Sequence, residues 1–244
     1  MDSLRPAPIA FAHRGARAQA PDNTVEAFVL ARQLGATGLE SDVWVTADGV
    51  AVLDHDGVVR SGPRDQPIPE VCRRDLPAHI PSLADLYAAC GTDYALSLDV
   101  KDVGAIRPVL DVAEQNGAGG KLWLCHHDWR MVASWRQLSS DVLMVDSTHL
   151  RAMRKGPERR AAQLADAGID AVNMHHSEWT ADLTALFHHH GILAFGWDAQ
   201  DHRILDSLLE MGIDAVYSDY VDRMNDAVSR FHLRAAREAG RDHR

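Results

Sequence analysis

Residues 191–218 read GILAFGWDAQDHRILDSLLEMGIDAVYS, and this stretch contains the repeating pattern that decides the fold. An apolar run over 193–197 predicts a strand, an amphipathic segment over 203–211 predicts a helix, and a second apolar run over 215–218 predicts another strand. A glycine precedes each strand, at the point where a helix is expected to end. Two strands joined through a helix are predicted to be parallel.

The same order recurs along the whole chain of 244 residues. Strands are predicted over 9–13, 38–45, 94–99, 122–125, 142–145, 171–174, 193–197 and 215–218. Helices are predicted over 24–34, 82–90, 105–116, 129–137, 159–167, 181–190, 203–211 and 222–238. Eight such pairs in a chain of about 250 residues predict an α/β protein with a (β/α)₈ TIM-barrel fold. An open doubly wound sheet is the alternative, because a sequence does not show closure.

No linker or change of composition divides the chain, so we expect one domain over residues 1–244. The segment from about residue 56 to residue 81 interrupts the alternation. It is predicted to be a loop or short insertion, after the second strand region, that covers one end of the barrel.

Composition excludes several classes of protein. The net charge is −10, which argues against a nucleic-acid partner because binding to phosphate backbones needs a basic face. No apolar stretch approaches the roughly 18 residues of a membrane span, and residues 1–6 lack signal-peptide features, so we expect no stable membrane insertion and a cytoplasmic location. Three widely spaced cysteines indicate neither a disulfide framework nor a thiolate zinc site. The sequence leaves the oligomeric state open.

Four short polar groups interrupt or end hydrophobic runs in the first 101 residues: His13-Arg14, Glu40-Ser41-Asp42, His55-Asp56 and Asp99-Val100-Lys101. Charged residues in such runs are costly unless they are paired, which suggests a shared site. Strand residues two apart share a face, so Glu40 lies with Asp42 and Asp99 with Lys101. At the carboxyl ends of barrel strands these side chains would meet.

The chemistry of this set suits a divalent cation and a phosphate ester. Three carboxylates without cysteine favour Mg²⁺, Ca²⁺ or Mn²⁺ over Zn²⁺. Two histidines on separate segments can divide proton transfer between the nucleophile and the leaving alkoxide. A structural ion pair between Asp99 and Lys101 is the alternative for those two residues.

Other groups are predicted to be structural or are left open. Adjacent histidines in His126-His127, His175-His176 and His188-His189-His190 do not all share a face, so no second metal site is expected. Trp197 shares its face with Leu193 and Phe195, so it either caps the core or forms part of the rim of the site.

In order along the chain, several motifs resemble the glycerophosphodiester phosphodiesterase family. They are Ala12-His13-Arg14-Gly15, Ala20-Pro21-Asp22-Asn23-Thr24, Leu39-Glu40-Ser41-Asp42-Val43, Thr46-Ala47-Asp48-Gly49, His55-Asp56, Ile80-Pro81-Ser82-Leu83, Asp99-Val100-Lys101, Gly191 to Trp197 and Ser218-Asp219. The resemblance covers nearly the whole chain.

The resemblance implies a (β/α)₈ barrel that hydrolyses glycerophosphodiesters to sn-glycerol 3-phosphate and an alcohol with a divalent metal, Mg²⁺ or Ca²⁺ first and Mn²⁺ after them. By motif match, it makes Glu40, Asp42 and Asp99 metal ligands and makes His13 and His55 the acid and base pair. Arg14 and Lys101 are then phosphate contacts, and Trp197 a substrate contact.

The sequence also departs from the family pattern. Asp99 replaces the usual Glu, and Val58-Val59-Arg60-Ser61-Gly62 stands where Leu-x-Arg-Thr-Thr is usual, within a shortened segment. Metal preference and substrate choice are therefore the least transferable properties. One alternative is a related phosphodiesterase that acts on lysophospholipids or other phosphodiesters, through hydrolysis or a cyclic phosphate. Another is a barrel that binds a phosphodiester without turnover.

Overall fold

The computed structural model describes residues 3–60 and 64–239. Its strands are β1 (Ile9–Ala12), β2 (Gly38–Val45), β3 (Ala51–Leu53), β4 (Val58–Val59), β5 (Gln66–Pro67), β6 (Ala95–Val100), β7 (Leu122–His126), β8 (Leu143–Ser147), β9 (Ala171–His175), β10 (Leu193–Trp197) and β11 (Ala215–Ser218). Its α-helices are α1 (Val25–Gln33), α2 (Leu83–Cys90), α3 (Ile106–Gln115), α4 (Trp129–Trp135), α5 (Pro157–Asp166), α6 (Ala181–His189), α7 (His202–Glu210) and α8 (Val221–Ala239).

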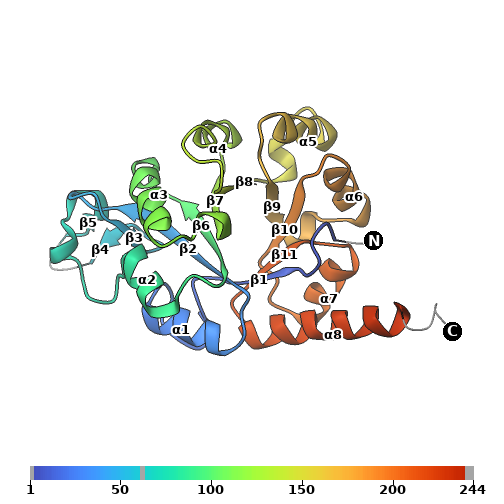
Figure 1. The fold of residues 1–244 in the computed structure, drawn as a ribbon, viewed down its shortest axis with the longest axis horizontal. Helices are drawn as coiled ribbons and strands as arrows, with labels where there is room; N and C mark the ends of the chain where they lie inside the picture. The colour runs from blue at the N-terminus through green and yellow to red at the C-terminus, as the bar shows by residue number, and fades with distance from the viewer. Residues whose placement is uncertain (1–2, 61–63, 240–244) are drawn as a thin grey trace.

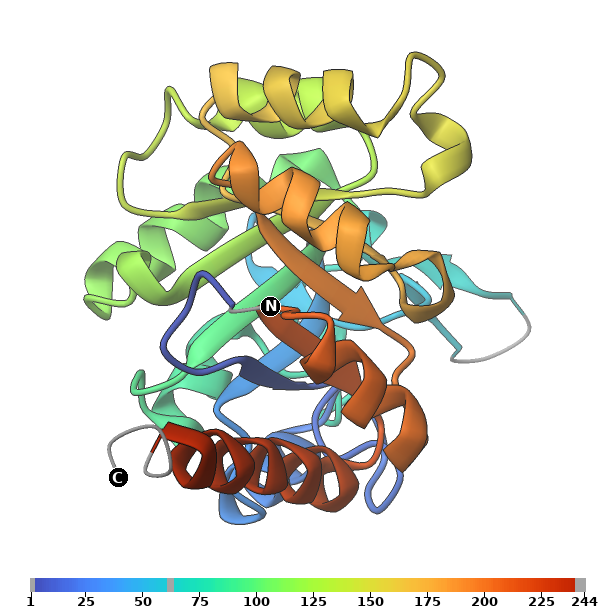
Figure 2. The same cartoon turned by 90° about the vertical axis from the view of Figure 1, so that its right-hand side faces the viewer.

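Within the described ranges, eight parallel strands close into a barrel. They pair in the order β1, β2, β6, β7, β8, β9, β10 and β11, and β11 pairs again with β1 through Ala12 and Ser218. The helices surround the strands, and α8 runs along one side of the molecule (Figures 1 and 2). The predicted TIM barrel is therefore confirmed, and the open sheet is not the fold.

Side chains of opposite faces of the strands form two separate hydrophobic clusters. Leu39 and Leu98 belong to the outer cluster, between strands and helices. Inside the barrel the ring of Phe11 stacks on Tyr217 with centroids 4.6 Å apart, and Trp123 meets Phe195 edge-on at 5.1 Å. Because aromatic side chains fill the interior, the barrel is a packed core and a ligand has room only at its ends.

The segment after β2 is more ordered than the predicted loop. β3 returns antiparallel to β2, and β4 pairs with β5 in a small second sheet, at one edge of the molecule (Figure 1). These strands and two 3₁₀ turns surround their own hydrophobic cluster of Val52, Val59, Ile68, Val71, Leu76 and Ile80. Ser61 and Gly62 of the shortened segment lie outside the described residues. That this segment covers the barrel end stays a prediction.

The helices of the described ranges include none whose length and apolar character would let it cross a membrane.

Candidate active site

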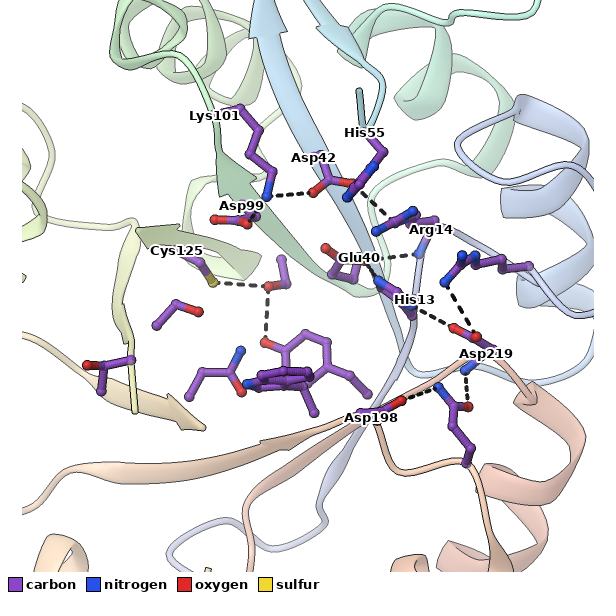
Figure 3. A pocket seen from close by; sticks show the side chains of 18 of the residues that line it. His13, Arg14, Glu40, Asp42, His55, Asp99, Lys101, Cys125, Asp198 and Asp219 are labelled. Atoms are coloured by element: carbon purple, nitrogen blue, oxygen red, sulfur yellow. Dashed lines mark hydrogen bonds and ion pairs between the residues drawn. The ribbon is translucent and has the colours of Figure 1, made fainter. Parts of the chain in front are cut away.

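A pocket of about 320 Å³ opens at the carboxyl ends of the barrel strands (Figure 3). All eight residues that the sequence analysis selected line it: His13, Arg14, Glu40, Asp42, His55, Asp99, Lys101 and Trp197. Barrel closure thus brings together side chains that are far apart in the sequence.

The acidic residues lie on two adjacent strands at matched levels. Asp42 of β2 pairs in register with Asp99 of β6, and Glu40 pairs with Ser97. Glu40 and Asp42 are 7% and 3% exposed, whereas the Asp99 side chain is 33% exposed. The alternation that the sequence predicts therefore places three carboxylates on the inner face of the barrel, two of them buried.

Two cationic side chains balance Asp42. Its Oδ2 lies 3.3 Å from Nε of Arg14, and its Oδ1 lies 3.1 Å from Nζ of Lys101, which also contacts Asp99. Burial alone lowers the pKa of Lys101, but the charges of Asp99 and Asp42 outweigh it and raise that pKa. The ammonium group therefore stays charged between the two carboxylates. The Asp99–Lys101 ion pair that the sequence allowed is present, and it lies within the pocket.

Asn23 links β2 to the segment before α1 through hydrogen bonds to Ser41 and Asp42, and no role was predicted for it. Ser41, on the outer face of β2, donates to Oδ1 of Asn23 over 2.6 Å, and Nδ2 of Asn23 donates to Asp42 over 3.4 Å. Asn23 has a φ of 54°, a left-handed conformation that asparagine tolerates better than most residues. Asn23 belongs to the motif before α1, but the motif alone does not show that its side chain contacts Ser41 and Asp42.

His13 is oriented by Asp219, which the sequence analysis recognised only as part of a motif. Its Nδ1 lies 2.6 Å from Oδ1 of Asp219, in the loop after β11, and its Nε2 lies 3.8 Å from Oε2 of Glu40. Burial raises the pKa of Asp219, but the hydrogen bond and charge of His13, with Arg17, lower it overall. An ionised carboxylate only accepts hydrogen bonds, so Nδ1 carries the proton and Nε2 faces the pocket.

The turn after His13 depends on a glycine. Gly15 has a φ of 81°, and a Cβ atom there would lie 2.7 Å from the backbone carbon of Ala27 in α1. Only glycine fits a left-handed position so close to a helix. The turn also directs the backbone N–H of Arg14 to Oε2 of Glu40, at 3.0 Å. One tight turn thus positions His13 and a backbone donor beside Glu40 and the Arg14 side chain beside Asp42.

Glu40 is the most strongly perturbed carboxylate of the pocket. Burial raises its pKa from the ordinary 4.5 to about 7; the charge of His13 acts against this, and those of Asp42 and Asp99 add to it. For His13, burial lowers the pKa, but Glu40 and Asp219 outweigh burial and raise it above 6.5. Shifted pKa values of interacting groups in one cleft are typical of functional sites.

These shifts predict how the stability of the metal-free protein depends on pH. The folded state holds the Glu40 proton more tightly than the unfolded chain, so stability falls as the pH rises from about 4.5 to about 7. The contribution of His13 to stability is complete below pH 6.5 and is lost as the pH rises through the raised pKa of His13. Both groups therefore make the protein less stable as the pH rises. Between pH 5 and pH 8 we expect the free energy of unfolding to fall by about 2–3 kcal/mol.

Urea unfolding of EDTA-treated protein checks this prediction. In the Glu40→Gln variant most of the slope should disappear, because glutamine does not titrate. An equal slope in the wild type and the variant would show that other groups determine the pH dependence.

His55 is presented by the loop between β3 and β4. Asp54 accepts from the backbone N–H of Gly57 over 2.7 Å, and Nε1 of Trp44 donates to the carbonyl of Asp54 over 2.9 Å. The Nδ1 atom of His55 lies 2.9 Å from Oδ1 of Asp56, and its side chain is 44% exposed. Nε2 of His55 takes no part in the contact with Asp56, and the His55 ring lines the pocket.

A different set of loops forms the remaining wall. Thr148 and His149 follow β8, and Trp197 and Asp198 end or follow β10. The ring of Trp197 meets His175 edge-on, with centroids 4.6 Å apart. This wall carries an aromatic side chain, a hydroxyl and an imidazole besides Asp198. It therefore differs in chemistry from the carboxylate side of the pocket.

The donor set fits a hard divalent cation. Three carboxylates face the two cations Arg14 and Lys101, and the crowding contributes to the raised pKa of Glu40. Oxygen donors of this kind bind Mg²⁺, Ca²⁺ and Mn²⁺, and a divalent charge would relieve their mutual repulsion.

Comparison with known proteins points to one family. The family model described as "Glycerophosphoryl diester phosphodiesterase family" matches residues 13–79. A Mycobacterium tuberculosis protein named "Probable glycerophosphodiester phosphodiesterase 2" is 30% identical over 240 residues, which cover 90% of each chain. Two solved structures have similar folds. A phosphodiesterase from Oleispira antarctica, in complex with the product sn-glycerol-3-phosphate, has a TM-score of 0.79 at 22% identity, covering 91% of this chain and 97% of that chain. A glycerophosphodiester phosphodiesterase from Thermotoga maritima has a TM-score of 0.76 at 22% identity, covering 89% and 97%.

Proposed function

Because this chain belongs to the glycerophosphodiester phosphodiesterase family, we propose that it hydrolyses glycerophosphodiesters to sn-glycerol 3-phosphate and an alcohol. The chain is a phosphodiesterase. The observation that carries the finer proposal is a single pocket that holds two histidines, three carboxylates and two cations. The product bound to the Oleispira antarctica phosphodiesterase supports the same small-molecule chemistry.

Glu40, Asp42 and Asp99 are the proposed ligands of a divalent cation, Mg²⁺ or Ca²⁺ first and Mn²⁺ after them. When bound, such a cation neutralises phosphate charge and polarises the P–O bond. The cations Arg14 and Lys101 contact the phosphate. They are held beside the carboxylates by the ion pairs to Asp42, so an anionic ester meets positive charge at a defined place.

The two histidines divide the proton transfers. The departing alkoxide needs a proton, and the attacking water must lose one. His13 has a raised pKa and an Nε2 atom that faces the pocket, so it is suited to donate to the alkoxide. His55, with Nδ1 beside Asp56, is suited to take the proton from water through Nε2. Trp197 contacts the substrate from the opposite wall.

Removal of metal tests this proposal. Activity on glycerophosphocholine or glycerophosphoethanolamine, measured as sn-glycerol 3-phosphate released, should fall to background after EDTA treatment. Readdition of Mg²⁺, Ca²⁺ or Mn²⁺ should restore it, because Lewis-acid stabilisation supplies several kcal/mol at the transition state. EDTA-treated enzyme that keeps full activity would overturn the metal assignment.

The product distinguishes hydrolysis from its alternatives. Phosphorus NMR after turnover in ¹⁸O-labelled water should show an open phosphomonoester that carries one solvent oxygen. A cyclic phosphate would support the alternative route, and turnover of lysophospholipids alone would change the substrate class. If the protein turns over no diester, the remaining alternative is a barrel that binds a phosphodiester without hydrolysing it.

We also propose the extent of the domain. The closed barrel that spans the described strands agrees with a single domain over residues 1–244, with the segment of about 56–81 as its covering insertion. The cytoplasmic location stays a prediction.

A further inference from the structure

A second group of potential metal ligands lies beside the pocket, on the side away from β2 and β6. It consists of His175 at the end of β9, His176 at the start of the next 3₁₀ turn, and Asp198 after β10. One donor atom of each lies within 4.8 Å of the others. Among the residues that the structure describes, this is the one set of three or more His, Cys, Asp or Glu side chains that converges so closely.

From the alternation of strand residues, adjacent histidines are expected to point to opposite faces, but His175 and His176 lie at the end of a strand. Alternation holds only while the backbone stays extended. At His175 the strand gives way to the 3₁₀ turn of residues 176–178, so the two rings lie with centroids 4.3 Å apart and 38° between their planes. The register pair Trp197↔His175 then brings the residue after Trp197, Asp198, alongside.

One pair of the three donors is spaced like two ligands of one ion, and the third donor lies within 4.8 Å of both. Bonds of about 2.0–2.2 Å in a tetrahedral site place two donors roughly 3.3–3.5 Å apart. Nε2 of His175 lies 3.2 Å from Oδ2 of Asp198. Both side chains keep exposed area, 27% for His175 and 49% for Asp198, so an ion has access from solvent.

Supporting contacts hold two of the three ligands. Nδ1 of His175 accepts from the backbone N–H of Ser177 over 3.3 Å and lies 2.7 Å from Oγ of Ser177, and these contacts fix the orientation of the ring. Nε2 of Gln200 donates to Oδ1 of Asp198 over 3.2 Å, and Asp198 has a φ of 62°, an unusual conformation that directs its side chain. Such outer contacts orient ligands in known metal sites.

From these observations we propose that His175, His176 and Asp198 form a second metal site that binds one transition-metal ion of the zinc class. Two imidazoles and one carboxylate suit Zn²⁺ better than Mg²⁺ or Ca²⁺, and three protein ligands leave one position for water. The site shares no ligand with Glu40, Asp42 and Asp99. The chain therefore carries a hard oxygen site and a nitrogen-rich site at the same mouth of the barrel.

Zinc binding to chelator-stripped enzyme tests the proposal. Zn²⁺ is titrated against a coloured competing chelator in excess Mg²⁺, which prefers the carboxylate site. We expect one Zn²⁺ per chain in the wild type and in the Glu40→Gln variant. The His176→Ala and Asp198→Asn variants should each bind at least about tenfold more weakly, since losing even a supporting contact costs about 10- to 100-fold.

The chain offers a matched control in His127. The His126-His127 pair also lies at a strand end, with ring centroids 4.2 Å apart, but converges with no third ligand in the described part of the chain. His127→Ala should therefore bind Zn²⁺ like the wild type. Co²⁺ gives a second readout, because its visible absorption should change in His176→Ala and not in His127→Ala. Circular dichroism confirms that each variant is folded.

Two results would overturn the proposal. One is a wild type that takes up no Zn²⁺ in excess Mg²⁺. The other is a pair of folded His176→Ala and Asp198→Asn variants that bind Zn²⁺ as tightly as the wild type, which would mean that these side chains form only a hydrogen bond.

Discussion

Replacement of His13 by glutamine is expected to lower kcat for glycerophosphodiester hydrolysis by about 10² to 10⁴. Glutamine keeps a polar side chain beside Asp219 and Glu40, but it cannot hold and release a proton near neutral pH. The loss should appear in kcat more than in KM, because a proton donor acts in the transition state and not in binding. Initial rates at saturating and at low substrate concentrations measure both constants.

His127→Gln is the matched control, because His127 lies outside the residues that line the pocket. Its kcat should equal that of the wild type. If His13→Gln keeps more than about a tenth of the wild-type kcat, general acid catalysis by His13 is wrong, since that contribution is typically at least 10².

Asp42→Asn is expected to abolish divalent binding at the carboxylate site and to lower kcat/KM by about 10² to 10⁴. The change keeps the size of the side chain and removes one charge from a site with three carboxylates. It also replaces one of the two oxygens that face Nε of Arg14 and Nζ of Lys101, at 3.3 and 3.1 Å, by an amide NH₂ group that cannot accept from a cation. Because both partners are partly exposed, the free energy of unfolding should fall by only about 1–3 kcal/mol.

Calorimetry with Mg²⁺ or Ca²⁺ and initial rates measure the two effects. Asp111→Asn, at an exposed position of α3, removes the same charge outside the pocket and should change neither. An Asp42→Asn variant that binds the ion with wild-type affinity would show that Asp42 is not a ligand of the metal.

The fold was predictable because its signals are local. Each barrel strand is an apolar run with a helix after it, and no predicted boundary differs from the structure by more than two residues. β3 was missed because three residues, Ala51–Leu53, are too short to show a period. The small cluster around Ile68 was missed because two-residue strands leave no pattern in a sequence.

The site was predictable where charged residues interrupt a strand, as Glu40 and Asp42 do. The contact of Asp219 with His13 was not predictable, because 206 positions separate the two residues and only barrel closure brings them together. The acidic loop after β11 was visible in the sequence, but its partner was not. The close approach of the His175 and His176 rings was not predictable either, because alternation holds only within a strand and His176 lies one residue beyond it.

The pocket has two walls of separate origin, and this separation bears on how the enzyme can evolve. The proposed reacting groups come from β1, β2, β6 and the loops beside them, where fixed register leaves little freedom. The opposite wall comes from loops after β8 and β10, including His149 and Trp197. Gln200 is an exception to this separation, because its Oε1 accepts from the backbone N–H of Asp219, which contacts His13. We therefore expect new leaving alcohols to be within reach of a mutant library confined to residues 147–149 and 197.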